Sequence, residues 1–171
     1  LEAAEKRGFG AEDEKGVRWD KNFTQWKFKD EEPLEKRGDQ KPIEVPFWSQ
    51  SPEYTVTWQY DKNANTYQRH HGTEAQVDPS TTETLSAKNV IIQLQVERQS
   101  NDGYPDGHLL YTTTGKGNAL IFMDGIVIKG TWNKKSRTAR TVFLDEKGKE
   151  ISLNRGQIWI ATIPVGNTVT Y

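Results

Sequence analysis

Cysteine is absent from the 171-residue sequence. The chain therefore forms no disulfide, offers no thiolate nucleophile and provides no cysteine ligands for zinc or an iron–sulfur cluster. Histidine is also scarce, and His70 and His71 are neighbours whose rings would point to opposite faces of a strand. We therefore expect no metal site, and no motif in the sequence indicates a cofactor.

Long apolar runs and an excess of one charge are missing as well. The sequence has no apolar stretch of about 18 residues, so it predicts no transmembrane helix, and it shows no signal-peptide pattern. The formal net charge is -1 at pH 7, which creates no overall field for nucleic acid, and we expect no nucleic-acid partner. The first residue is Leu1, and its helix-like surroundings lead us to expect the later part of a longer precursor.

What the sequence does contain is hydrophobicity with a period of two. Val56 and Trp58 alternate with polar residues, and Val90, Ile92 and Leu94 share one face of a later segment. Strands are predicted over residues 54–60, 66–71, 85–97, 108–114, 118–123, 126–132, 140–144 and 157–163. This spacing predicts an antiparallel or mixed β-rich domain of about eight strands.

The first 42 residues differ from this pattern. Leu1–Arg7 consists of good helix formers and is followed by Gly8, so it predicts a short N-terminal helix. Residues 9–42 are rich in charge and contain proline and glycine, which is typical of a connector. The predicted fold class is therefore α+β, predominantly β, with residues 43–171 as the β-rich domain.

Two segments resemble ligand-binding loops but depart from the required patterns. Asp61–Asn65 matches the first, third and fifth ligand positions of a calcium-binding loop. The sixth position requires Gly but is Thr66, and the twelfth requires Glu but is Gly72. The glycines of Thr114–Asn118 lack Walker A spacing and precede a predicted strand, whereas a phosphate loop opens a helix. We interpret the first as a hairpin turn and the second as a bulge or close backbone approach.

Two carboxylates, Asp102 and Asp106, lie in a segment rich in glycine and proline. A pair of carboxyl groups about 5–10 Å apart can perform acid–base chemistry on a glycan. The same composition is typical of a solvent-exposed loop. The sequence leaves both interpretations open, and the first supports a ligand-binding role or, as the alternative function, an enzyme that processes cell-wall glycan or peptide.

Four cationic side chains gather in the connection between two predicted strands: Lys134, Lys135, Arg137 and Arg140. Charged connections are common because they keep sheet edges soluble. They also suit a patch for an anionic polymer, such as a teichoic acid, or for a phospholipid surface. The connection is therefore either a solvated loop or a binding surface.

The six tryptophans allow two roles in the same way. Tryptophan on a strand usually packs in the core, whereas an exposed tryptophan can stack on a sugar ring. The residues concerned are Trp19, Trp26, Trp48, Trp58, Trp132 and Trp159.

Several segments together resemble the C-terminal domain of the YerB-like bacterial lipoproteins. The resemblance covers about residues 43–164 and rests on Tyr54–Asp61, Tyr67–Arg69, Leu85–Ile91, Gly115–Gly117, Gly130–Lys134, Thr141–Phe143 and Gly148–Ile160. Leu1–Phe9 also resembles the last helix of that family's N-terminal domain. Residues 1–42 are then the end of an upstream α/β domain and a connector.

The resemblance implies an exported protein, tethered to the cell membrane through a lipidated cysteine upstream of this chain. The family has no established activity, so it assigns no catalytic residues. The function that we expect is a non-catalytic extracytoplasmic module that binds or scaffolds at the bacterial envelope. Its partner would be an anionic wall polymer or another envelope protein, and the basic connection is the first surface to test.

Overall fold

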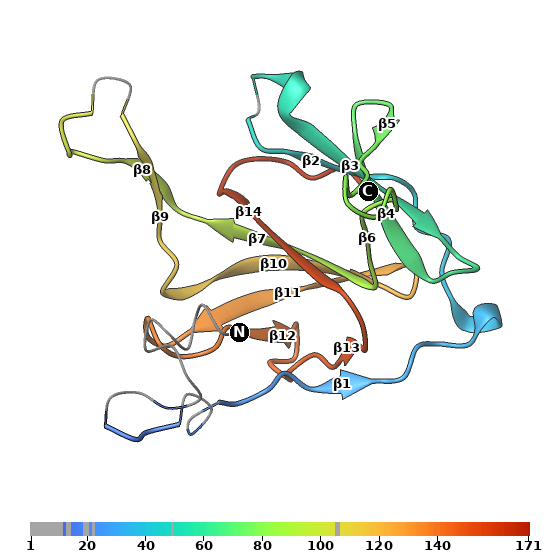
Figure 1. Cartoon of the computed structure of the whole chain (residues 1–171), viewed down its shortest axis with the longest axis horizontal. Coiled ribbons are helices and arrows are strands. Elements are labelled where there is room, and N and C mark those ends of the chain that lie inside the picture. Colours follow the sequence, from blue (N-terminus) through green and yellow to red (C-terminus); the bar gives the residue numbers. More distant parts are fainter. Residues whose placement is uncertain (1–11, 13–14, 19–20, 22, 49, 105–106) are drawn as a thin grey trace.

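The computed structural model describes residues 12, 15–18, 21, 23–48, 50–104 and 107–171. Two five-stranded sheets dominate these residues, and a narrow two-stranded arm extends from one of them (Figure 1). The central sheet contains, in spatial order, β12 (Val142–Asp145), β11 (Ile126–Lys134), β10 (Gly115–Met123), β7 (Asn89–Gln95) and β14 (Ile158–Pro164). All neighbours in it are antiparallel except β7 and β14, which are parallel.

The outer sheet is built around one hairpin. Its strands are β2 (Ile43–Pro46), β3 (Thr55–Asp61), β4 (Thr66–His71) and β5 (Glu74–Ala75), and β6 (Ser86–Ala87) pairs with β4 beside β5. Two small sheets complete the fold. β1 (Phe28–Lys29) pairs in parallel with β13 (Leu153–Asn154), and β8 (Glu97–Gln99) pairs with β9 (Leu109–Tyr111) to form the arm.

Both faces of the central sheet are covered. On one face Val90, Ile92 and Phe122 pack against Trp58 and Tyr67 of the outer sheet. On the other face a second cluster contains buried residues of β7, β10, β11 and β12 and is covered by the segments around β1 and β13. Its buried members are Ile91, Ala119, Ile121, Met123, Trp132, Phe143, Ile151 and Leu153, with Trp26, Ile128 and Ile158 at its margin. Because β7 lies between the two clusters, its hydrophobic residues are buried on both faces.

The predicted α+β fold with about eight strands is wrong, although the β-rich character is confirmed. The described residues form fourteen strands and two short 3₁₀ turns, η1 (Leu34–Lys36) and η2 (Pro52–Tyr54), and contain no α-helix. Four of the strands have only two residues, too few for a period of two to appear in the sequence. The predicted helix Leu1–Arg7 lies outside the described residues.

The segment predicted as one strand over residues 85–97 shows why the count was too low. β6 belongs to the outer sheet and β7 to the central sheet, so the chain crosses from one sheet to the other at Lys88. It then leaves the central sheet as β8, which enters the arm. Ala87 of β6 and Val90 and Ile92 of β7 are buried in the same core, so the whole segment has the composition of one long strand. The alternation shifts by one residue between Ala87 and Val90, which is the only local sign of the crossing.

Figure 1 shows the arm projecting away from the two sheets. Leu109 and Leu110 are neighbours on β9, so they face opposite sides, and both are exposed. No helix in the described part of the chain has the length and apolar character that crossing a bilayer would require.

Candidate functional site

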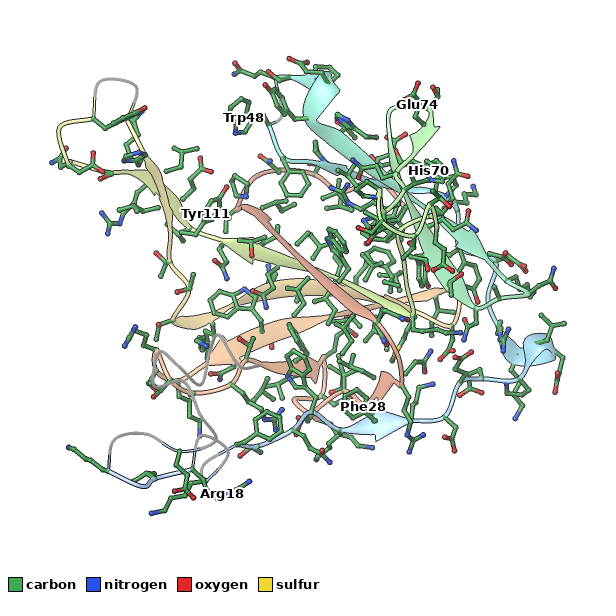
Figure 2. All side chains as sticks on the ribbon, viewed as in Figure 1. Arg18, Phe28, Trp48, His70, Glu74 and Tyr111 are labelled. Atoms are coloured by element: carbon green, nitrogen blue, oxygen red, sulfur yellow. The ribbon has the colours of Figure 1, made fainter. Side chains whose placement is uncertain are left out.

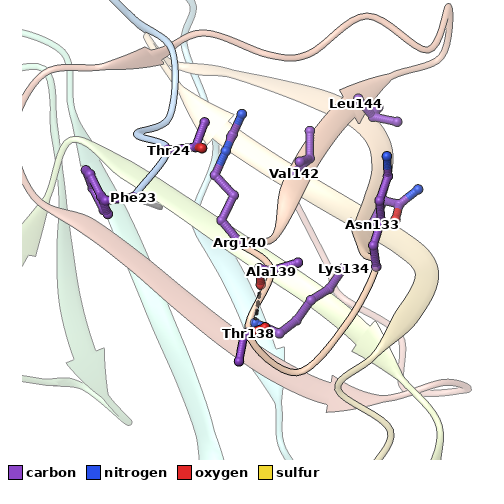
Figure 3. Close-up of a pocket in the computed structure, with 10 residues that line it drawn as sticks. Phe23, Thr24, Asn133, Lys134, Thr138, Ala139, Arg140, Val142 and Leu144 are labelled. Atoms are coloured by element: carbon purple, nitrogen blue, oxygen red, sulfur yellow. Dashed lines mark hydrogen bonds between the residues drawn. The ribbon is translucent and has the colours of Figure 1, made fainter. Parts of the chain in front are cut away.

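The connection between β11 and β12 borders a cavity of about 750 Å³ (Figure 3). Strand register pairs Asn133 with Val142, so the residues between them must form a loop at the end of the sheet. The cavity is lined by Phe23, Thr24, Asn133, Lys134, Lys135, Thr138, Ala139, Arg140, Val142 and Leu144. Three of the four predicted basic residues therefore line one cavity, and Arg137 lies in the same loop without lining it.

Two of the lining cations hold the loop in shape. Lys134 Nζ donates a hydrogen bond to the carbonyl oxygen of Ala139, at 2.7 Å (Figure 3). Arg140 Nη1 donates to Glu150 Oε1 at 2.6 Å, and Lys27 Nζ is 3.4 Å from the other oxygen of the same carboxylate. The hydrogen bond from Arg140 outweighs partial burial and keeps the pKa of Glu150 below its ordinary value. Removing Lys134 or Arg140 would therefore disturb the loop itself.

Lys135 and Arg137 have a different environment. Both are exposed, and neither side chain makes an ion pair or hydrogen bond within the described part of the chain. An exposed cation without a partner keeps its full charge available to an incoming anion. These two side chains give the loop a local positive field although the chain as a whole carries a net charge of -1.

A buried polar network occupies the opposite end of the central sheet, where the β10–β11 turn meets the β3–β4 turn. At its centre is Asp124, which is 3% exposed. Its Oδ1 accepts hydrogen bonds from Asn65 Nδ2 at 2.8 Å and Asn154 Nδ2 at 2.7 Å. Its Oδ2 accepts from Lys29 Nζ at 2.6 Å. The Asp-Gly pair at 124–125 is typical of a tight turn, but no local pattern indicates this role, because the partners of Asp124 come from three other parts of the chain.

The network extends outward from Asn65, which is completely buried. Tyr60 Oη donates to Asn65 Oδ1, and Asn65 Nδ2 donates to Glu31 Oε2, each at 2.8 Å. Lys88 Nζ lies 2.7 Å from the other carboxylate oxygen of Glu31. The segment that precedes the outer sheet is thereby tied to two hairpin turns and to the crossing between the sheets.

The electrostatics of Asp124 indicate a structural role for this network. Burial raises the pKa of the carboxyl group, but the donors from Lys29, Asn65 and Asn154 together hold it below its ordinary value. Asp124 is therefore a carboxylate at neutral pH, and protein donors already occupy both of its oxygens. A carboxylate so engaged is a poor general base and a poor ligand.

The two sheets contain the part of the chain that is shared with a known family. Residues 43–160, from the start of β2 into β14, match the family model described as "Protein of unknown function (DUF3048) C-terminal domain". The chain belongs to this family. The match confirms the YerB-like resemblance at the level of the domain, and the family description assigns no activity.

A solved structure shows the same fold as this DUF3048 C-terminal domain. The crystal structure of YerB from Bacillus subtilis superposes with a TM-score of 0.70 and 21% sequence identity. The alignment covers 99% of this chain and 52% of the YerB chain, so this chain spans about half of the length of that protein. At this identity the similarity shows the fold alone. A comparison with curated proteins gave no match.

Of the two predicted carboxylates, Asp102 lies in the DUF3048 domain's arm, between β8 and β9. Its Oδ2 is 2.6 Å from Nδ1 of His108, and its Oδ1 accepts from the backbone N–H of Tyr104 at 3.1 Å. These contacts hold the pKa of Asp102 below its ordinary value and close the loop onto itself. Asp106 lies outside the described residues, so the carboxylate pair stays a prediction.

The tryptophans divide into packed and exposed residues. Trp58 and Trp132 are at most 3% exposed, and Trp26 and Trp159 are partly buried against the two clusters. Trp159 also lies under the guanidinium of Arg69, 4.9 Å from the ring centroid. Trp48 is 50% exposed, and Trp19 lies outside the described residues. Core packing thus explains the described tryptophans except Trp48.

The lowered pKa of Asp124 predicts how the stability of the DUF3048 domain changes in acid. A depressed native pKa gives stability that is fully present above the unfolded-state pKa of about 3.9 and is lost as pH falls through the native value. The stability difference between wild type and Asp124→Asn should be constant above about pH 5 and shrink below about pH 4. Urea unfolding of both proteins from pH 3 to pH 7 measures it. A difference that does not change with pH would contradict an ionised Asp124.

Proposed function

We propose that this domain is a non-catalytic binding module that takes an anionic polymer at the cavity beside the β11–β12 connection. The observation that carries the proposal is a pair of exposed cations, Lys135 and Arg137, that have no partner within the described residues and flank a cavity of about 750 Å³. Cations that serve only the loop would be expected to have partners in it, as Lys134 and Arg140 do.

The lining of the cavity suits a polymer that carries negative charges along a carbon backbone. Phe23, Val142 and Leu144 provide apolar contact, and Lys134 and Lys135 provide positive charge. Charge attraction at this surface acts over about 10 Å at 0.1 M salt, so the net charge of the whole chain does not cancel it. Teichoic acid, with phosphate groups repeated along a polyol chain, has this chemistry.

The proposed location is extracytoplasmic, at the bacterial envelope. It includes a tether to the membrane through a lipidated cysteine upstream of this chain. The support for both is the resemblance to the YerB-like lipoproteins, and the anionic ligand is consistent with them because wall polymers lie in that compartment. Lipid labelling of the intact precursor in its native cell, followed by fractionation, tests the location independently of binding.

The binding test compares two variants with the same change in charge. Lys135→Ser/Arg137→Ser should weaken binding of poly(glycerol phosphate) about tenfold in low salt, since each exposed charge contributes up to about 1 kcal/mol. The control, Lys36→Ser/Lys41→Ser, removes two exposed cations that lie away from the cavity and should bind like wild type. Affinity electrophoresis of the full chain in gels containing the polymer gives the dissociation constants.

Salt separates a specific surface from a general attraction. The difference between the two variants should fall as ionic strength rises, because exposed charges are screened. Equal weakening in both variants, or no binding by wild type in low salt, would show that the β11–β12 connection is a solvated loop.

A further inference from the structure

Trp48 and Tyr54 form an exposed aromatic pair between β2 and β3. Their ring centroids are 4.6 Å apart at an interplanar angle of 60°, and the residues are 50% and 48% exposed. The backbone N–H of Ser51 donates to the carbonyl of Trp48 at 3.1 Å, and η2 then brings Tyr54 beside the indole. Phe47, one residue earlier, packs against the core between the sheets. The turn therefore buries one aromatic residue and directs the next into solvent.

A groove of about 320 Å³ extends from Trp48 to Glu97, at the root of the arm. Figure 2 shows Trp48 projecting from the loop after β2, with Tyr111 at the root of the arm. The groove is lined by Phe47, Trp48, Gln50, Ser51, Glu97, Pro164 and Asn167. Four of these seven side chains are polar, so the groove combines aromatic surface with hydrogen-bonding groups.

Two of the polar groups are held in fixed orientations. Burial and the hydrogen bond to Glu97 raise the pKa of Tyr111 to about 12, so at neutral pH its hydroxyl donates to Glu97 Oε2, at 2.6 Å. Asn167 Nδ2 donates to the carbonyls of Pro46 at 2.8 Å and Phe47 at 3.0 Å. Glu97 Oε1 and Asn167 Oδ1 have no hydrogen-bond partner among the described residues and remain available as acceptors.

We propose that this groove binds a neutral polysaccharide, with a pyranose ring against Trp48 and its hydroxyls donating to Glu97 and Asn167. A pyranose has an apolar C–H face and a rim of hydroxyl groups. An indole face beside carboxylate and amide oxygens matches both parts. Gln50 and Ser51 are free to adapt, since neither side chain is hydrogen-bonded within the part of the chain that the structure describes.

The charge and polarity of the groove argue against other occupants. Its lining contains a carboxylate and no cation, so a polyanion would meet repulsion at Glu97. An apolar helix would remove water from Glu97 and Asn167 without replacing their hydrogen bonds, which is unfavourable. The groove thus differs in charge from the cavity at the β11–β12 connection, and this inference goes beyond the proposed function without depending on it.

The test is isothermal titration calorimetry of the full chain with β-1,4-linked pentamers of N-acetylglucosamine and of glucose. Wild type should bind at least one of them with a dissociation constant of about 0.1–10 mM. Trp48→Ala should weaken that binding at least about tenfold, and Trp48→Phe should restore most of it because a ring face is retained. Lys135→Ser/Arg137→Ser should bind the sugar like wild type.

The matched control is Tyr104→Ala. Tyr104 is 53% exposed and stacks on His108 in the arm loop, so it is as exposed as Trp48 but does not line the groove. It should bind the sugar like wild type, and the thermal midpoints of both variants show that they fold. The inference is overturned if neither pentamer binds at 20 mM, or if Trp48→Ala and Tyr104→Ala behave alike. It is also overturned if no sugar binds and Trp48→Ala instead abolishes self-association or binding of poly(glycerol phosphate), because Trp48 would then serve another partner.

Discussion

Replacing Asp124 by Ala is expected to lower the free energy of unfolding by about 2–4 kcal/mol. The carboxylate is 3% exposed and accepts from Lys29, Asn65 and Asn154. Alanine would leave Asn154 Nδ2 without its acceptor in the protein interior and would remove one of the two acceptors of Asn65 Nδ2. Lys29, whose side chain is 29% exposed, would lose its nearest carboxylate and keep only Glu32 at 3.8 Å. Alanine also lacks the local hydrogen bonds that help Asp adopt the positive φ of 51° at this position. Urea unfolding at pH 7 measures the loss.

The control for this change is Asp39→Ala. Asp39 Oδ1 lies 2.8 Å from Lys62 Nζ, but the aspartate side chain is 84% exposed. An exposed ion pair contributes little, so this variant should lose less than about 1 kcal/mol. Similar losses in the two variants would mean that the network around Asp124 adds no more than a surface pair. The comparison thus separates the effect of burial from the effect of losing a carboxylate.

Local features of the fold could be predicted from the sequence because a few neighbouring residues determine them. Alternation identified β3, β4 and β7 within a few residues, and the turns at Asp61–Asn65 and Asp124–Gly125 lie where Asn, Asp and Gly permit a positive φ. Two-residue strands such as β1 exist only because another segment lies beside them. Such strands cannot be read from a local pattern.

The network around Asp124 could not be predicted for a related reason. Asn65, Asp124 and Asn154 each occur in an ordinary turn or strand end, and no spacing in the sequence connects them. The packing of separate sheets against one another brings the amide groups of Asn65 and Asn154 within 3 Å of the Asp124 carboxylate. The basic connection was predictable as a cluster of charge, because its residues are neighbours. That Arg140 has a partner was not predictable, because the following hairpin supplies Glu150.

The exposure of Trp48 also could not be predicted from the local sequence. Trp48 and Phe47 are adjacent aromatic residues, and hydrophobicity alone predicts that both are buried. The structure separates them because successive residues point in opposite directions where β2 ends. A candidate glycan surface therefore becomes visible only once the fold is known.

The contact between Gly38 and Gly125 gives the second large expected effect. A Cβ atom on Gly125 would overlap the carbonyl of Gly38 and the ring of Tyr60, and a Cβ on Gly38 would overlap the carbonyl of Gly125. The two backbones are this close because Gly38 N–H donates to the carbonyl of Asp124, at 2.9 Å. Gly125 also has a φ of 70°. The Asp-Gly pair indicates a turn at Gly125, but nothing in the local sequence indicates the contact with Gly38.

Three alanine variants separate the close approach from the backbone conformation. Gly72 has a φ of 60°, and a Cβ atom added there would meet nothing within 4 Å, so Gly72→Ala should lose only about 1–2 kcal/mol from left-handed strain. Gly38 has no positive φ, so Gly38→Ala should lose about 1–3 kcal/mol from overlap alone. Gly125→Ala combines both effects and should lose about 2–5 kcal/mol. Urea unfolding of the three proteins gives these values.

The order of the three losses is the decisive result. If Gly125→Ala were no less stable than Gly72→Ala, the segment that contains Gly38 would be free to move away from the β10–β11 turn. A segment that moves in this way would hold the hydrogen bond from Gly38 N–H to the Asp124 carbonyl less firmly. The expected large loss of stability in Asp124→Ala would then have less support. If the losses follow the predicted order, the segment before the outer sheet is fixed to the central sheet by backbone contact as well as by side chains. The buried network and the glycine contact would then form one structural unit.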